Sequence, residues 1–331
     1  TMAIGVLMAA GGLAVSSLGS LWAIYVGHGL MLGLLGNAAL YPPLLVYVSR
    51  WFERRRGTAL ALISSGQYVA GVIWPTIFER GMTSMGWQTV MLWYGVVLIV
   101  LVLPVTFLLK PAPSVAEAKS KGPAARMQGN RVVGLRPNIV QALLCMAGFF
   151  CCIPMSIPSA HLVAFCTDIG VSPTRSATML SVMLAAAFFA RQAWGLLADR
   201  IGGLGTVLAG SACQAVAIAA FLITRDEIGL FAISAAFGFA FAGIIPAYAV
   251  TIRDLFPSSE ASWRIPLTLF TAMSGMAVGS WLAGALYDRY GYYDAAFGNA
   301  VLFNLANLCI IGWLFFRNAD MSRRNAAAIA G

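Results

Sequence analysis

The sequence predicts an all-α polytopic membrane protein, and two features of its composition carry that prediction. Hydrophobic residues make up 60% of the 331 residues, and charged residues make up only 10%. Soluble domains carry about 25% charged residues, and a soluble protein has no interior large enough for so much apolar surface. Most of that surface must therefore face a lipid bilayer or neighbouring helices.

Ten apolar stretches are long enough to cross a membrane, since a spanning helix needs about 20 such residues. The expected spans are 2–18, 21–48, 57–78, 88–109, 138–165, 176–197, 204–223, 228–251, 265–286 and 295–316.

The segment between the fourth and fifth spans is polar and rich in Pro, Gly and Lys/Arg, which is typical of a flexible linker. We therefore expect four parts: an N-terminal bundle (1–109), a linker (110–137), a six-helix bundle (138–317) and a tail (318–331).

The net charge of +9 is explained by the loops and does not require a nucleic-acid partner. Most of the 21 Lys and Arg residues lie in one alternating set of loops, which the positive-inside rule assigns to the cytoplasm. The linker and the C-terminus belong to that set. We expect the plasma membrane, specifically the inner membrane of a bacterium, with both of these segments cytoplasmic.

The cysteines form no CxxC pair, so the sequence predicts no metal site. It indicates no cofactor either. HExxH and GxSxG patterns are absent, which argues against an enzyme.

The third and ninth spans resemble each other, since each has arginine at its start and Ser-Gly about ten residues later (Ser65-Gly66 and Ser274-Gly275). A parallel repeat six spans apart is typical of one transporter architecture. Two matching six-helix halves require two further helices before Thr1, so we expect the chain to begin at the third of twelve helices.

The turn Gly195-Leu-Leu-Ala-Asp-Arg-Ile-Gly202 resembles the G-x-L-a-D-R-x-G-r-k signature of the major facilitator superfamily. It departs from the signature at Gly203 and Leu204, where the family has a basic pair. The resemblance implies two helical bundles, of which this chain supplies ten of the twelve helices.

Three pieces resemble the monocarboxylate transporters and oxalate/formate antiporters within that superfamily. They are Trp51–Gly71 at the fifth helix, Ile157–Gly170 at the end of the seventh and Ala190–Gly195 in the eighth. In those transporters the eighth-helix arginine binds the substrate carboxylate, which implies this role for Arg191.

Arg191 lies inside an apolar span, about 12 Å along the helix from Asp199. A cation at that depth costs several kcal/mol, roughly 2.5–3.5 even on the lenient insertion scales. All twelve carboxylates lie in loops or at span ends, so a substrate carboxylate is the expected partner. Snorkelling toward the interface is the structural alternative.

His161 follows two prolines in its span, and it could carry a coupled proton or serve as a helix-end hydrogen-bonding residue. Related carriers often place an Asp one turn before the arginine, but Ala187 stands there. The coupling mode, with a proton or an exchanged anion, therefore stays open. Weaker candidates for the substrate path are polar residues of other spans, and for each of them helix packing is the alternative: Asn37, Tyr41, Ser64, Gln67, Tyr248, Thr271 and Ser274.

Asp199 and Arg200 are predicted to belong to a cytoplasmic gate. We expect Asp199 to pair with Arg264 at the start of a later helix, where the positive helix end favours a carboxylate.

The sequence therefore predicts a secondary carrier of a small organic anion, a mono- or dicarboxylate, that works by alternating access. The alternative is a carrier of the same superfamily for a non-anionic solute, with Arg191 structural.

Overall fold

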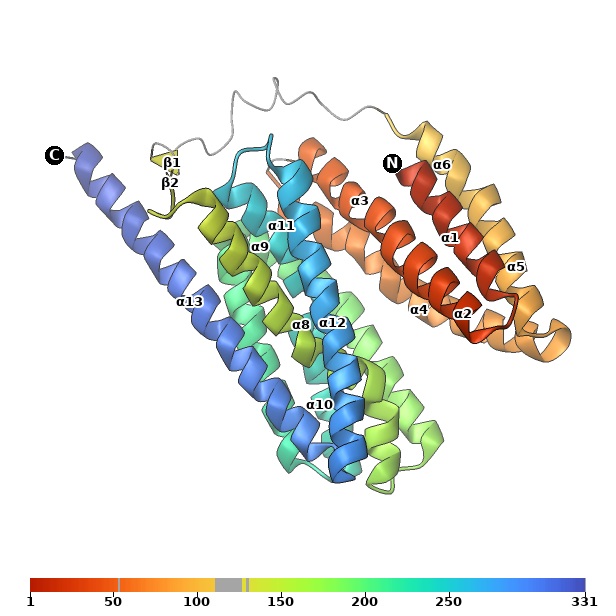
Figure 1. Ribbon diagram of the computed structural model, residues 1–331. Coiled ribbons are helices and arrows are strands. Elements are labelled where there is room, and N and C mark those ends of the chain that lie inside the picture. Colours follow the sequence, from red (N-terminus) through yellow and green to blue (C-terminus); the bar gives the residue numbers. More distant parts are fainter. Residues whose placement is uncertain (53, 111–126, 129–130, 331) are drawn as a thin grey trace. The chain divides into compact units, whose positions relative to one another are not determined.

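The computed structural model describes residues 1–52, 54–110, 127–128 and 131–330. All ten expected spans are helical in this structure (Figure 1). Most of the expected linker, 111–126 and 129–130, lies outside the described residues. The part of it that is described contains a short antiparallel pair, β1 (Met127–Gln128) and β2 (Arg131–Val132).

The helices form two compact units. The first comprises Thr1–Trp51 and Val69–Ala118, and the second comprises Phe52–Tyr68 and Lys119–Gly331. The start of α4 (Arg56–Met85) therefore packs with the later helices, whereas the rest of that helix belongs to the first unit. The sequence-based boundaries of the two bundles remain a prediction.

In the first unit, close packing joins the first two spans. Its helical segments, some with wider π-type turns, are α1 (Met2–Ser16), α2 (Leu21–Ile24), η1 (Tyr25–Gly36), α3 (Asn37–Trp51), α5 (Trp87–Val97), η2 (Leu98–Val102) and α6 (Leu103–Leu108). A β-carbon on Gly12 would lie 2.5 Å from the Gly27 carbonyl oxygen. Nδ1 of His28 lies 2.7 Å from Ser16 Oγ, so this histidine ties η1 to α1.

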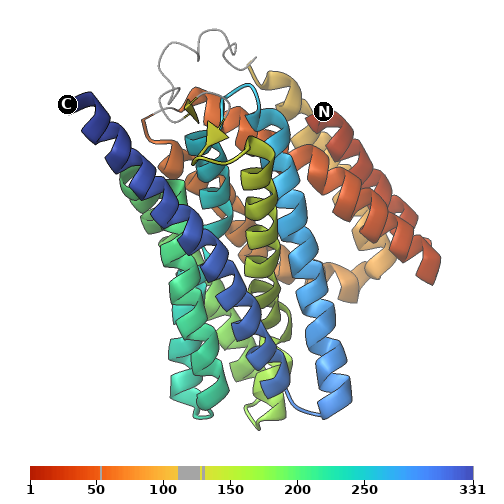
Figure 2. The same ribbon diagram turned by 60° about the vertical axis from the view of Figure 1, so that its left-hand side comes forward.

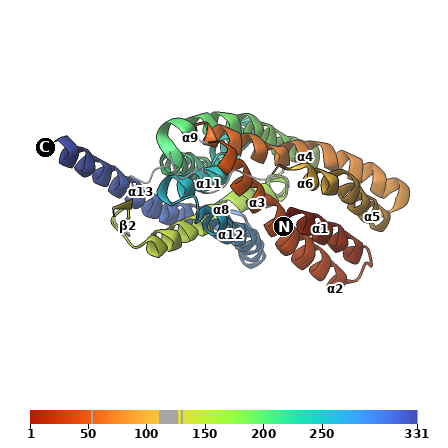
Figure 3. The ribbon, with the colours of Figure 1, turned by 90° about the horizontal axis from the view of Figure 1, so that it is seen from above.

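In the second unit, six spans pack together. They are formed by α8 (Pro137–Asp168), α9 (Pro173–Ile223), α10 (Glu227–Phe241), α11 (Ile244–Leu255), α12 (Ala261–Tyr290) and α13 (Asp294–Ala330). Helix α12 packs against α8 and, less extensively, against α11 (Figure 3). Helix α13 crosses the second segment of α9 and continues as helix through the residues expected to form the tail (Figure 2).

One long helix, α9, contains two of the expected spans, because the backbone breaks at Gly202. Its φ of 78° and ψ of 168° lie outside the region that residues with a side chain adopt readily. Outer faces of this unit expose large apolar side chains, such as Val216, Ile223 and Ile228, which suits a helix surface in lipid.

Helices α8 and α12 approach closely at a glycine pair, as the spacing Gly275-x-x-x-Gly279 predicts. A β-carbon on Gly275 would overlap the Phe149 carbonyl oxygen, and one on Gly279 would overlap the Ile153 carbonyl oxygen. The pair therefore lets two backbones meet.

Gly279→Val is expected to destabilise the fold, because its side chain would push α12 away from α8. Overpacking of a tight contact costs about 1–3 kcal/mol or more. Thermal unfolding of purified protein in detergent should show a Tm several degrees below that of the parent. Gly298→Val is the matched control, since a β-carbon on Gly298 meets no atom within 4 Å. Equal Tm values for the two variants would contradict this packing role.

Candidate functional site

Arg191 and Asp199 lie two turns apart on the first segment of α9, before the break at Gly202. Both side chains point to the start of α4. The second segment of α9 begins with Gly203, whose N–H donates to Asp254 Oδ2 at 2.9 Å. The break at Gly202 therefore ends the segment that carries both predicted functional residues.

The guanidinium of Arg191 is almost fully buried, with 1% of the residue exposed. Nε donates to the Ala242 carbonyl at 2.7 Å, Nη1 to the Ser64 carbonyl at 2.7 Å, and Nη2 to the Tyr68 hydroxyl at 2.8 Å. The Tyr68 ring lies 4.4 Å from the guanidinium carbon, as in a cation–π contact. Among the described residues, no carboxylate pairs with Arg191, so only neutral groups surround this charge.

The Ala242 carbonyl that accepts from Arg191 lies at a break between α10 and α11. Helix α10 ends at Phe241 and α11 begins at Ile244. A residue larger than glycine at Gly243 would overlap the Trp194 ring, which packs one turn after Arg191. The break and the glycine together let α9 approach near enough for Arg191 to reach this carbonyl.

Asp199 caps the N-terminus of α4. Its Oδ1 accepts from the Gly57 N–H at 2.6 Å, and its Oδ2 accepts from the Thr58 N–H at 3.0 Å and the Thr58 hydroxyl at 2.5 Å. A carboxylate there satisfies first-turn amides that have no partner within the helix, and it faces the positive end of the helix dipole.

The predicted pair between Asp199 and Arg264 is wrong. Arg264 Nε donates instead to Glu260 at 2.6 Å on its own helix, and its guanidinium lies over the rings of Phe256 and Trp263. The expectation that Asp199 faces a helix N-terminus was correct, but the helix is α4. Arg264 is buried, with 2% exposed, because α8 and α12 enclose it and its local carboxylate satisfies it.

Between these two polar contacts, α4 and α9 meet through glycines. A β-carbon on Gly57 would lie 2.6 Å from the Gly195 carbonyl oxygen, and one on Gly195 would lie 2.6 Å from Ala61 Cβ. We call this contact the α4–α9 seam; it is formed by Gly57, Thr58, Ala61, Ser64 and Tyr68 of α4 and by Arg191, Gly195, Ala198 and Asp199 of α9. The hydrogen bonds of Arg191 hold one end of the seam together, and those of Asp199 hold the other end.

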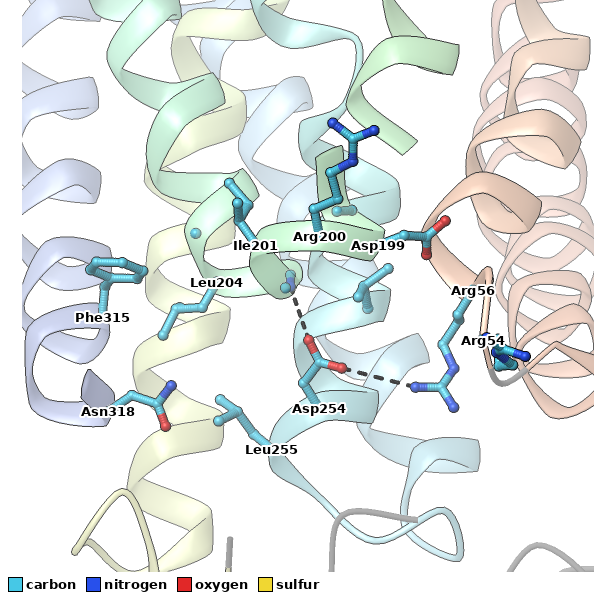
Figure 4. A pocket seen from close by; sticks show the side chains of 15 residues that line it. Arg54, Arg56, Asp199, Arg200, Ile201, Leu204, Asp254, Leu255, Phe315 and Asn318 are labelled. Carbon is cyan, nitrogen blue, oxygen red and sulfur yellow. Dashed lines mark hydrogen bonds and ion pairs between the residues drawn. The ribbon is translucent and has the colours of Figure 1, made fainter. Parts of the chain in front are cut away.

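A cavity of about 330 Å³ opens beside the break at Gly202 (Figure 4). Its walls include Arg54, Arg56 and Asn318, and Asp254 lies between Gly203 and Arg56, 3.9 Å from Arg56 Nη1. The side chain of Arg200 points away from Asp254 (Figure 4). Asp254 therefore joins the start of α4 to the second segment of α9, close to the contact of Asp199.

His161 lies near the C-terminal end of α8, on a different helix from Arg191. One ring nitrogen, Nε2, lies 3.0 Å from the Ser280 carbonyl and must donate to it, which leaves Nδ1 as acceptor from the Tyr293 hydroxyl at 3.4 Å in the neutral ring. Burial raises the pKa of the Tyr293 phenol, so this hydroxyl keeps its proton near neutral pH. These contacts join α8 to α12 and to the loop after it.

The remaining candidates occupy different environments. Tyr248 is buried in the second unit, where its hydroxyl donates to Asn307 Oδ1 at 3.3 Å. Gln67 belongs to the same unit and is exposed, whereas Asn37 (exposed) and Tyr41 (half-buried) belong to the first unit. Neither Tyr248 nor Gln67, which share a unit with Arg191, takes part in the hydrogen bonds of its guanidinium.

The sequence did not predict the groups that contact Arg191, since Ser64 was a candidate for its side chain and not for its carbonyl. Tyr68 and Ser64 are four residues apart and therefore share one face of α4, and both are buried, whereas Gln67 is exposed. That spacing was the available signal for Tyr68. The sequence contains no signal for the Ala242 and Ser64 carbonyls, because every residue has a backbone carbonyl.

A family model described as the Major Facilitator Superfamily matches residues 1–225 and 144–330. The chain belongs to the major facilitator superfamily. It is thus an integral membrane transporter rather than an enzyme, as the sequence predicts.

Curated relatives are similar along most of the chain. Monocarboxylate transporter 13 of Bos taurus is 29% identical over 311 residues, covering 91% of this chain and 70% of the relative. The MFS-type transporter pynF of Aspergillus niger is 26% identical over 281 residues, covering 82% and 62%. These relatives are eukaryotic, so they give no support to a bacterial inner membrane.

Solved structures show the same fold. The fucose transporter FucP in the outward conformation has a TM-score of 0.71 at 14% identity, covering 95% of this chain and 82% of FucP. The human organic anion transporter MFSD10 has a TM-score of 0.70 at 15% identity, covering 94% and 76%. At these identities the likeness concerns the fold alone.

Proposed function

We propose that this transporter is a secondary carrier of a small organic anion, a mono- or dicarboxylate, and that Arg191 binds the substrate carboxylate. One observation carries the proposal: the charge of Arg191 is buried among neutral groups, with no carboxylate of the described chain beside it. A planar guanidinium grips a carboxylate through two parallel hydrogen bonds. The resemblance to monocarboxylate transporters supports the same substrate class.

Asp199 acts in this proposal as a gate residue. Its contact with the first turn of α4 lies at the end of the seam toward the predicted cytoplasmic loops, and it opens and re-forms during each cycle of alternating access. Arg200 lies next to it at the cavity, and Arg264 serves the gate by fixing α12 against α8. His161 is the candidate for a coupled proton, because an imidazole can both accept and release a proton.

A second function is favoured by the same contacts around Arg191. Three neutral acceptors satisfy Nε, Nη1 and Nη2, which is enough for a purely structural arginine. The chain would then carry a non-anionic solute.

A proteoliposome uptake screen distinguishes the two functions. The full-length protein is tested with radiolabelled lactate, pyruvate, formate, oxalate and aromatic acids, beside neutral amides of the same carbon skeletons. Saturable uptake of an acid but not of its amide supports the anion carrier. Uptake of the neutral compounds alone would favour a structural Arg191.

Asp199→Asn is expected to lower the initial uptake rate at least about fivefold, because the carrier must re-form this charged contact once in each cycle. Hydrogen bonds to a charged group contribute about 1.5–3 kcal/mol. Asp226→Asn is the matched control, since Asp226 caps α10 in the same way by accepting from the Gly229 N–H at 2.7 Å. An unchanged rate for Asp199→Asn at normal protein level would refute the gate.

A further inference from the structure

Groups of the chain itself accept all the hydrogen bonds that Arg191 makes in this structure. The Ala242 carbonyl accepts from Nε, so Nη1 and Nη2 form the end of the guanidinium that is left for another ligand. One oxygen lies on each of these nitrogens, the Ser64 carbonyl at 2.7 Å and the Tyr68 hydroxyl at 2.8 Å. A carboxylate bound end-on places one oxygen on each of the same two nitrogens. The two α4 oxygens therefore stand where the two oxygens of a carboxylate would stand.

Both of these α4 oxygens are neutral, and a substrate carboxylate is not. Charge-assisted hydrogen bonds are roughly twice as strong as neutral ones, so a carboxylate can displace the pair. A neutral solute lacks that advantage. Water is a poor substitute, because Arg191 is 1% exposed and Tyr68 is 4% exposed.

We infer that the Ser64 carbonyl and the Tyr68 hydroxyl form an internal substitute for the substrate carboxylate, and that Tyr68 is a positioning residue that sets how tightly Arg191 binds an organic anion. Because this role requires Arg191 to bind the anion, it rests on the proposed function. It adds a specificity element: the site admits only a ligand that outcompetes two neutral oxygens.

The same displacement acts on the seam. Ser64 and Tyr68 lie on the segment of α4 whose first turn is held by Asp199. An anion that takes the Nη1–Nη2 end removes one of the two polar contacts of the seam and leaves Asp199 as the other. A ligand shifts a conformational equilibrium by its difference in affinity for the two states. Anion binding at Arg191 thereby favours parting of α4 from α9.

Tyr68→Phe separates the two contributions of Tyr68. It keeps the ring that lies 4.4 Å from the guanidinium carbon and deletes the oxygen that accepts from Nη2. Only the anion-free state loses a hydrogen bond, since in the anion-bound state the hydroxyl has already been displaced. The variant is therefore expected to bind an anion more tightly, by about three- to tenfold, because the competing state becomes less populated.

The test measures binding and uptake on the full-length protein. Dissociation constants of lactate, pyruvate and oxalate are determined by isothermal titration calorimetry in detergent, and KM and the maximal uptake rate are determined in proteoliposomes. Two controls accompany Tyr68→Phe. Ser65→Ala removes a hydroxyl of the same helix that bonds back to the Leu62 carbonyl, and Tyr290→Phe makes the same atomic change at an exposed position.

Each outcome decides the inference. A lower dissociation constant and a lower KM in Tyr68→Phe, with both controls unchanged, support it, and general damage to the fold would not lower KM. An unchanged or weaker affinity in Tyr68→Phe, while Arg191→Gln abolishes binding, overturns the inference but leaves the anion carrier intact. If no acid binds the parent, or Arg191→Gln binds as well as the parent, the proposed function fails and the inference fails with it.

Discussion

Arg191→Gln should reduce uptake of the transported acid by at least about 100-fold. Two charge-assisted hydrogen bonds to the substrate are lost, each contributing about 1.5–3 kcal/mol, and every 1.4 kcal/mol is a factor of ten in affinity. Arg191→Lys should fail almost as completely, because an ammonium is a point charge and cannot present two parallel donors. Initial uptake rates in proteoliposomes at matched protein density measure both effects.

A control must separate lost binding from lost folding, because glutamine leaves buried acceptors such as Ser64 and Ala242 without a guanidinium. Arg175→Gln is suitable, since Arg175 is an exposed arginine that pairs with Glu227. It should transport like the parent. The size-exclusion profile and Tm of Arg191→Gln report its folding, and uptake at the parental rate would make Arg191 structural and favour a non-anionic solute.

The helices were predictable because each span is a long apolar run, and the break at Gly202 was expected because charged and glycine residues interrupt the pattern between 197 and 204. The position of Arg191 was predictable for the same reason, since a cation stands out in an apolar helix. Its contacts were not, because two of its acceptors are backbone carbonyls, and the spacing of Ser64 and Tyr68 places Tyr68 on one face of α4 without showing which helix that face meets.

The partner of Asp199 shows a second limit. A carboxylate at a helix end predicts a helix N-terminus nearby, and this was correct in kind. Several helices begin on the predicted cytoplasmic side. The positive charge of Arg264 favoured the start of α12 as the partner. What decides the choice is the close approach of Gly57 to Gly195, a backbone contact across 138 positions of sequence that no pattern along one helix reveals.

Gly195→Val is expected to abolish transport while preserving anion binding. A β-carbon at this position would lie 2.6 Å from Ala61 Cβ and 3.0 Å from the Gly57 carbonyl oxygen, so a valine holds α4 away from α9. Overpacking of this kind costs about 1–3 kcal/mol, enough to depopulate the closed seam. A carrier that cannot close the seam cannot complete the cycle, yet Arg191 then faces fewer competing oxygens from α4.

Calorimetry with lactate, pyruvate and oxalate should therefore show an affinity equal to or tighter than that of the parent, and proteoliposome uptake should fall below about 1% of the parental rate. The less bulky Gly195→Ala should give an intermediate rate, since it adds only the β-carbon. Gly66→Val is the matched control, because a β-carbon there meets no atom within 4 Å. Normal uptake by Gly195→Val would mean that the seam need not close, and loss of both binding and uptake in a folded protein would mean that the seam holds Arg191 in its binding position rather than competing for it.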